Sequence, residues 1–164
     1  MVLNLDNEIF DLVVVLFANI INVFVIGIFV SRTGRNSTLE RTLGLLMVSL
    51  AIPMMAIVLH NFLDRRSWWT IVLPGIMVFY LSLEFVLDYA LKINFRKTIF
   101  LWPYLVVFYA ALMSMIGFAF LTSRVLGYVT LLTYFLGLAA TWYSYSKVGH
   151  GRTASETTRG GHSK

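Results

Sequence analysis

The chain contains no cysteine and only three histidines, two of which, His150 and His162, lie near its C-terminus. The lack of cysteine excludes a disulfide framework, a thiolate metal site and a cysteine nucleophile. With so few histidines as well, we predict neither a metal site nor a cofactor. The sequence also lacks a glycine-rich phosphate loop and a basic patch of the kind that binds nucleic acid, so we expect no nucleic-acid partner.

Charged residues are scarce. They make up 13% of the 164 residues, whereas hydrophobic residues make up 59%. A soluble domain has about 25% charged and about 45–50% apolar residues. A soluble core of this size cannot bury so much apolar surface, and the remainder would form aggregating patches. The composition therefore predicts an integral membrane protein, with membrane lipid as its immediate partner.

Five apolar segments approach or exceed the length of about 18 residues that indicates a spanning helix. The predicted spans are residues 12–31, 43–62, 69–91, 99–121 and 125–146. Because the connections are short, neighbouring helices should run antiparallel. The sequence thus predicts an all-α fold, a five-helix transmembrane bundle over residues 1–148. The tail, residues 149–164, is rich in Gly, Ser and Thr, and we expect it to be disordered.

Two local signals concern the second span. Pro53 lies inside it and should kink the helix unless a neighbouring group satisfies the freed carbonyl, because proline cannot donate the hydrogen bond that continues a helix. Ser37 and Glu40 match a capping box, in which the two side chains cap the first turn of a helix. We therefore expect the helix of the second span to begin at this box.

The distribution of Lys and Arg predicts the orientation of the bundle. The first and third connections and the tail together carry ten of the 13 Lys and Arg residues, and the other side carries three. Basic residues concentrate on the cytoplasmic side of membrane proteins. The N-terminus is therefore expected outside and the C-terminus in the cytoplasm, in the cell membrane. Trp68 and Trp69 then mark the outer interface, and Trp102 and Trp142 the inner one.

Two carboxylates interrupt the third span, in the stretch LSLEFVLDYALKINFRK. Glu84 is expected about 6 Å on the cytoplasmic side of the bilayer midplane, at a rise of 1.5 Å per residue. A charge near the bilayer centre costs about 2.5–3.5 kcal/mol, so Glu84 should face the bundle interior and be protonated or hydrogen-bonded. Asp88 lies one turn nearer the cytoplasm, where Lys92 is a natural ion-pair partner.

Other polar side chains at the depth of Glu84 predict a polar layer in the cytoplasmic half of the bundle. They are Asn19, Asn22, Tyr104, Tyr109, Tyr134 and Thr141. This layer either forms a site for a ligand or proton or consists of hydrogen bonds that hold helices together. At the outer end of the second span, His60, Asn61 and Asp64 are interpreted as an interfacial polar cluster.

Small residues indicate where helices can approach closely. Ala110, Ser114 and Gly117 share one face of the fourth span, and Gly137 and Thr141 lie four residues apart in the fifth. Such spacings allow tight contact between transmembrane helices. The contact is either between these two helices or with a second copy or another membrane protein.

Three functions remain open. The first is binding or transport of a small cationic or amphipathic ligand, or an ion, with Glu84 as a protonatable carboxylate and aromatic residues as the pocket wall. The second is a structural or regulatory subunit of a membrane complex. The third is a small lipid-modifying enzyme with Glu84 and Asp88 as acid and base. The first is favoured, because no motif supports turnover, and we do not expect an enzyme.

Overall fold

The computed structural model of the chain describes residues 5–91 and 100–148. All regular secondary structure in these two ranges is helical. The elements are α1 (Leu5–Thr33), α2 (Ser37–Ser49), α3 (Ala51–Leu63), α4 (Trp69–Glu84), the π-helix η1 (Phe85–Ala90), α5 (Leu101–Thr122) and α6 (Arg124–Val148). The predicted tail, residues 149–164, lies outside these ranges.

Five helical units in the described ranges are long and apolar enough to cross a membrane. They are Asn7–Thr33, Ser37–Leu63, Trp69–Ala90, Leu101–Thr122 and Arg124–Lys147. The predicted all-α, multi-pass membrane protein is confirmed at this level. The first unit begins earlier than expected, because the apolar helix continues through the acidic residues that precede position 12. Which side of the membrane each end faces stays a prediction.

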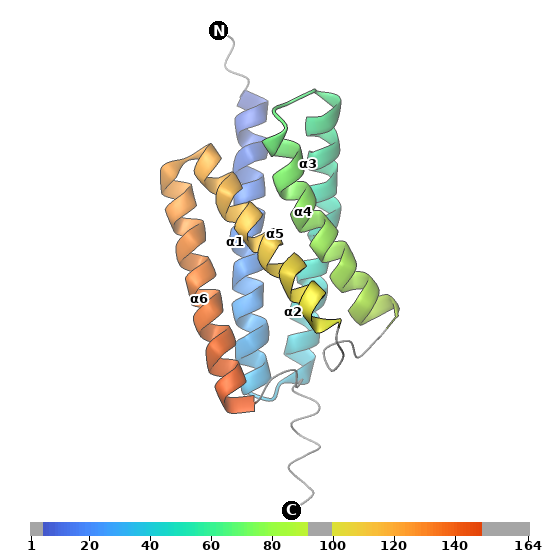
Figure 1. The fold of residues 1–164 in the computed structure, drawn as a ribbon, viewed down its shortest axis with the longest axis vertical. Coiled ribbons are helices and arrows are strands. Elements are labelled where there is room, and N and C mark those ends of the chain that lie inside the picture. The colour runs from blue at the N-terminus through green and yellow to red at the C-terminus, as the bar shows by residue number, and fades with distance from the viewer. Residues whose placement is uncertain (1–4, 92–99, 149–164) are drawn as a thin grey trace, which may run out of the picture.

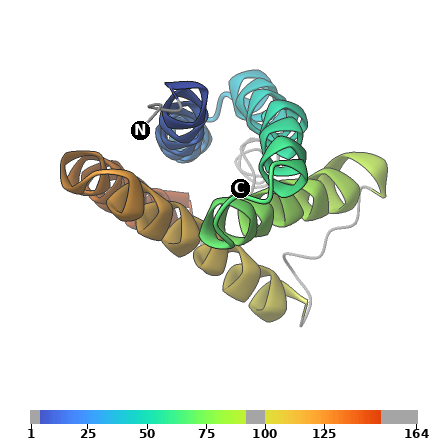
Figure 2. The same cartoon turned by 90° about the horizontal axis from the view of Figure 1, so that it is seen from above.

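The bundle has two ends, which we name from Figure 1. At the upper end α1 begins and α3 connects to α4; at the lower end α1 connects to α2 and α6 ends. Helix α1 contacts α2 and α6, α4 contacts α3 and α5, and α5 contacts α6. Helix α5 crosses the bundle obliquely (Figure 1), and α4 lies between α3 and α5 (Figure 2).

The second membrane-spanning unit is broken into α2 and α3 at Leu50. There the N–H of Leu50 donates to the carbonyl of Met47, three residues back, at 3.2 Å. Pro53 has no N–H for the carbonyl of Ser49, and its ring displaces that carbonyl. The helical hydrogen bonding is therefore interrupted three residues before the proline, while Leu50 keeps right-handed helical backbone angles, and the change of helix direction stays a prediction.

The first turn of α2 is capped differently from the prediction. The side-chain oxygen of Asn36 accepts a hydrogen bond from the N–H of Leu39 at 3.0 Å. The predicted capping box of Ser37 and Glu40 is wrong, since the Glu40 carboxylate instead pairs with Arg32 at 2.8 Å. Asparagine is as good a helix cap as serine, so the first turn of α2 is capped while Glu40 pairs with Arg32.

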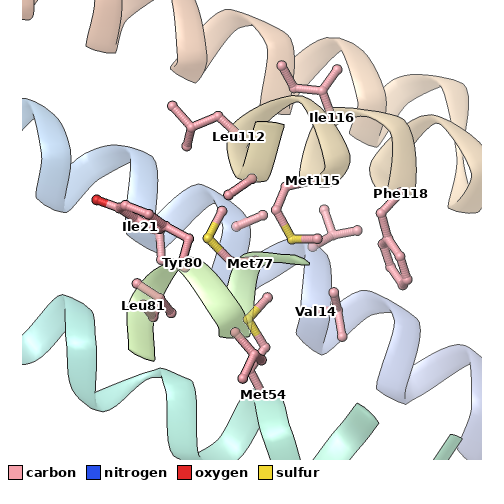
Figure 3. Packing of buried hydrophobic residues seen from close by; sticks show 14 of the residues in the cluster. Val14, Ile21, Met54, Met77, Tyr80, Leu81, Leu112, Met115, Ile116 and Phe118 are labelled. Carbon is pink, nitrogen blue, oxygen red and sulfur yellow. The ribbon is translucent and has the colours of Figure 1, made fainter. Parts of the chain in front are cut away.

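The centre of the bundle is a close-packed apolar layer. Met54, Met77 and Met115 come from α3, α4 and α5 and meet there, with exposed fractions of at most 2% (Figure 3). Leu81 and Phe118 are fully buried in the same cluster. Methionine is flexible and adapts to irregular spaces between packed helices. This methionine core separates the polar groups at the two ends of the bundle.

Candidate functional site

A cavity of about 300 Å³ lies in the lower half of the bundle, between α1, α2, α4, α5 and α6. Its wall is largely aromatic, with Phe29, Tyr80, Tyr104, Phe108, Tyr109 and Tyr145 among the lining residues. Glu84, Arg32 and Thr141 add polar groups to the wall. Ligand pockets span about 300–1,000 Å³, so this volume is enough for a small organic molecule.

Glu84 is buried inside the bundle, with 8% of its surface exposed. Its Oε2 atom accepts a close hydrogen bond from the Tyr104 hydroxyl, which reaches it from α5. The hydroxyls of Tyr104 and Tyr80 lie 3.2 Å apart, so the two tyrosines and the carboxylate form one hydrogen-bonded chain. The carboxylate is thus oriented by a neighbouring helix at the wall of the cavity.

Glu84 is the last α-helical residue before the π-helix η1. Here the N–H of Leu91 donates to the carbonyl of Val86, five residues back, at 2.8 Å. The wider turn changes the rotation of the residues that follow Glu84, and such π-helical turns occur frequently at functional sites. Asp88, in this turn, is half-buried and does not line the cavity. Its predicted partner Lys92 lies outside the described ranges.

The asparagines of the predicted polar layer form a separate cluster between α1 and α6. Asn19 donates to the Thr130 hydroxyl at 3.0 Å and accepts from the Thr133 hydroxyl at 2.9 Å. Asn22 donates to the Thr133 hydroxyl at 2.9 Å. Tyr134 is buried in the apolar core. The structure therefore gathers Glu84, Tyr104, Tyr109 and Thr141 around the cavity but places Asn19, Asn22, Asp88 and Tyr134 elsewhere.

Arg32 lines the cavity. From the sequence it contributes only to the count of basic residues that predicts the orientation in the membrane. It is 6% exposed, and its Nε and Nη2 atoms donate to a single oxygen of Glu40 at 3.0 and 2.8 Å. The carbon of its guanidinium lies 5.1 Å from the centre of the Phe29 ring. Its position in the cavity could have been predicted from helical spacing. Arg32 follows Phe29 by three residues and Ile28 by four, so the three share one helix face, and all three line the cavity.

A second buried polar cluster, at the upper end, ties α1 to the turn between α3 and α4. Arg66 donates to both carboxylate oxygens of Asp11, at 2.9 and 2.8 Å, and to the side-chain oxygen of Asn61 at 3.1 Å. Asn61 in turn donates to the carbonyl of Thr70 at 3.0 Å. Of the predicted cluster of His60, Asn61 and Asp64, only Asn61 belongs to this network, which we call the upper polar cluster.

The upper polar cluster and the Arg32–Glu40 pair lie at the two ends of the same helix. At 1.5 Å per residue, Asp11 and Arg32 are about 30 Å apart along α1. This matches the thickness of the hydrocarbon core of a bilayer, about 30 Å. The two buried ion pairs therefore fit positions at the two membrane boundaries, and the cavity extends inward from the lower one.

Comparison of the chain with protein-family models, with curated proteins and with solved structures finds no match in any of the three sets. The functional argument therefore rests on the cavity and on the side chains that line it.

Proposed function

We propose that the protein binds a small amphipathic organic cation in the lower cavity and that the Glu84 carboxylate recognises its ammonium group. The observation that carries this proposal is a buried carboxylate on the wall of an open, aromatic-lined space. Ring faces attract cations, most strongly where water is excluded, and the Tyr80 and Phe108 rings line the same space as Glu84. An alkylammonium ion fits both features.

The hydrogen-bonded chain of Glu84, Tyr104 and Tyr80 supports a binding site that is oriented in advance. Tyr104 fixes the direction of the carboxylate, and Tyr80, which is 2% exposed, holds Tyr104 from the side of the core. Preorganised polar groups lose less entropy when a ligand binds.

Above Tyr80 the interior is filled by the methionine core. Transport through the bundle would require that layer to open, whereas binding does not. We therefore propose binding, and transport only if the layer opens.

A structural or regulatory subunit is the second candidate. The observation that favours it is Gly117 on α5, where an added Cβ would meet no atom within 4 Å among the described residues. That position is open to a neighbouring helix. The rest of the predicted small-residue surface is divided: Ala110 is exposed, Ser114 is buried, and a Cβ on Gly137 would contact Val25 and Ile26 of α1 at 4.0 and 3.9 Å.

An enzyme is less well supported, because its proposed acid and base do not share the cavity. Glu84 lines the space, whereas Asp88 does not. A carboxylate pair that acts on one substrate needs both groups within hydrogen-bond reach of the reacting atoms.

The test compares hexylamine with hexanol in titrations of the protein in phosphatidylcholine nanodiscs, with empty nanodiscs subtracted. A hydrogen bond to a charged group contributes about 1.5–3 kcal/mol, so hexylamine should bind at least about tenfold more tightly than hexanol. Glu84→Gln keeps the shape of the side chain and should remove this preference. Asp88→Asn, the matched control one turn away, should retain it.

Equal binding of hexylamine and hexanol to the wild-type protein would contradict the proposal, as would an unchanged preference in Glu84→Gln. If Glu84→Gln leaves both titrations featureless but alters the proteins that co-purify with the chain, the subunit candidate is favoured instead.

A further inference from the structure

The guanidinium of Arg32 is only partly used by the protein. Both of its bonds go to one oxygen of Glu40, and among the described residues no hydrogen bond is made by Nη1. A guanidinium has five N–H donors, and it binds carboxylates and phosphates through two parallel bonds. Arg32 is 6% exposed and lines the cavity, so its remaining donors are available mainly to an occupant of that space.

The burial of Arg32 is not needed for membrane topology. Arg35, in the turn between α1 and α2, and Arg41, near the start of α2, are exposed and satisfy the preference for basic residues on that side. The Phe29 ring stands 5.1 Å from the guanidinium carbon and covers one face of the group. Approach along the edge remains, which is the geometry in which arginine recognises a planar anion.

We propose that Arg32 is a second recognition group and that the ligand is bipolar, with an ammonium group at Glu84 and a carboxylate or phosphate at Arg32. The apolar wall formed by Ile28, Leu105 and Phe108 lines the same cavity and takes the body of the ligand. Binding of the ammonium group at Glu84 rests on the proposed function, whereas binding of the anionic group rests on Arg32 alone.

The anionic group has two possible sources, a soluble zwitterion or the headgroup of a membrane lipid. Arg32 lies at the end of α1 at the lower membrane boundary, where both can reach it. The shared chemistry is an anionic oxygen group joined to an apolar body. Competition experiments separate the two sources.

The test uses four probes of matched length, 6-aminohexanoate, hexanoate, hexylamine and hexanol, in micelles of dodecyl maltoside, whose headgroup carries no charged group. We expect 6-aminohexanoate to bind wild-type protein at least about tenfold more tightly than hexylamine, because its carboxylate adds a charge-assisted pair of bonds. Arg32→Gln should abolish this advantage and leave hexylamine favoured over hexanol. Arg41→Gln, the exposed control, should change neither ratio.

Glu40→Gln separates recognition from a merely structural ion pair. If Arg32 binds the ligand, removal of the competing Glu40 carboxylate leaves the affinity for 6-aminohexanoate unchanged or raises it. If the pair only ties α1 to α2, Glu40→Gln and Arg32→Gln should weaken binding alike, which would overturn the proposal. Should Arg32→Gln alone fail to fold, the double variant Arg32→Gln/Glu40→Gln removes both charges and carries the same expectation for the carboxylate advantage.

Equal affinities of wild-type protein for 6-aminohexanoate and hexylamine would overturn the inference about Arg32. The proposed function would still stand if hexylamine were favoured over hexanol in a Glu84-dependent way, so the two failures are distinguishable. Loss of the carboxylate advantage in micelles containing phosphatidylglycerol supports the proposal with lipid as the source of the anion. If the carboxylate advantage is instead lost when inorganic phosphate is added, and is kept with phosphatidylglycerol, the proposal is supported with a soluble ligand as the source of the anion.

Discussion

At the scale of single residues, the buried charges of residues 5–91 and 100–148 lie in pairs or on hydrogen-bond donors. Glu84 accepts from Tyr104, Arg32 pairs with Glu40, and Arg66 pairs with Asp11. A buried pair is weak evidence for net stability, because both ions lose their hydration. Removal of one partner is costly all the same, because it leaves the other charge buried and unpaired.

Asp11→Asn tests this reasoning at the upper polar cluster. The change keeps the shape of the side chain but leaves the half-buried Arg66 guanidinium without its carboxylate, and a hydrogen bond to a charged group contributes about 1.5–3 kcal/mol. The free energy of unfolding, measured by denaturant titration in detergent micelles, should fall by about that amount. Asp64→Asn, at a side chain that is 54% exposed, is the control and should change it by less than about 0.5 kcal/mol. Equal effects of the two changes would contradict the account.

At the scale of helices, the sequence predicts length and depth but not rotation about the helix axis. The five spans follow from apolar runs, and Glu84 attracts attention because a charge inside a span is costly. Which helix a polar residue faces depends on packing against neighbours. Asn19 and Asn22 are predicted at the depth of Glu84, but their side chains bond to Thr130 and Thr133 on α6. The role of Arg32 was missed because a basic residue at the end of a span also satisfies topology.

The turn between α5 and α6 gives a prediction at this scale. A Cβ added to Gly127 would overlap the ring of Phe120. An aromatic ring is rigid, so it cannot move aside without a cost in free energy. Gly127→Ala should therefore destabilise the protein by about 1–3 kcal/mol, as overpacking of a core does. Gly117→Ala is the matched control, since a Cβ there meets nothing within 4 Å among the described residues. It should be neutral or stabilising by up to about 1 kcal/mol, because alanine favours helices over glycine.

The measurement is the denaturation midpoint of the two glycine variants in detergent, which tests the predicted difference in their stability. If Gly127→Ala and Gly117→Ala shift it in the same direction and by the same amount, the close approach of α6 to Phe120 is refuted.

At the scale of the whole molecule, the two ion-pair clusters lie at the two ends, and the methionine core and the hydrogen bonds of Asn19 and Asn22 lie between them. The upper polar cluster links α1, α3 and α4, the cavity opens the lower half, and the methionine core divides the two. This organisation fits a protein that binds its ligand from one side of the membrane. The cytoplasmic orientation of the lower end rests on the distribution of Lys and Arg along the sequence.

Single-cysteine labelling tests that orientation without background, because the natural chain has no cysteine. Ser37 at the lower end and Ser67 at the upper end are both exposed and differ from cysteine by one atom. On intact cells, a membrane-impermeant maleimide should label Ser67→Cys and leave Ser37→Cys unlabelled until the membrane is permeabilised. The reverse pattern would show that the cavity faces outward.

The central claim is that the cavity holds the ligand, and protection of a single cysteine in its wall tests that claim most directly. Thr141 lines the cavity, whereas Ser146 lies further along the same helix, exposed and away from it. The rate of alkylation of Thr141→Cys in nanodiscs is measured with and without hexylamine, and Ser146→Cys serves as the control. We predict that hexylamine slows alkylation at position 141 several-fold, leaves position 146 unaffected, and loses its effect when Glu84→Gln is added. Equal alkylation rates at position 141 with and without hexylamine, at concentrations that saturate binding, would show that the ligand binds elsewhere.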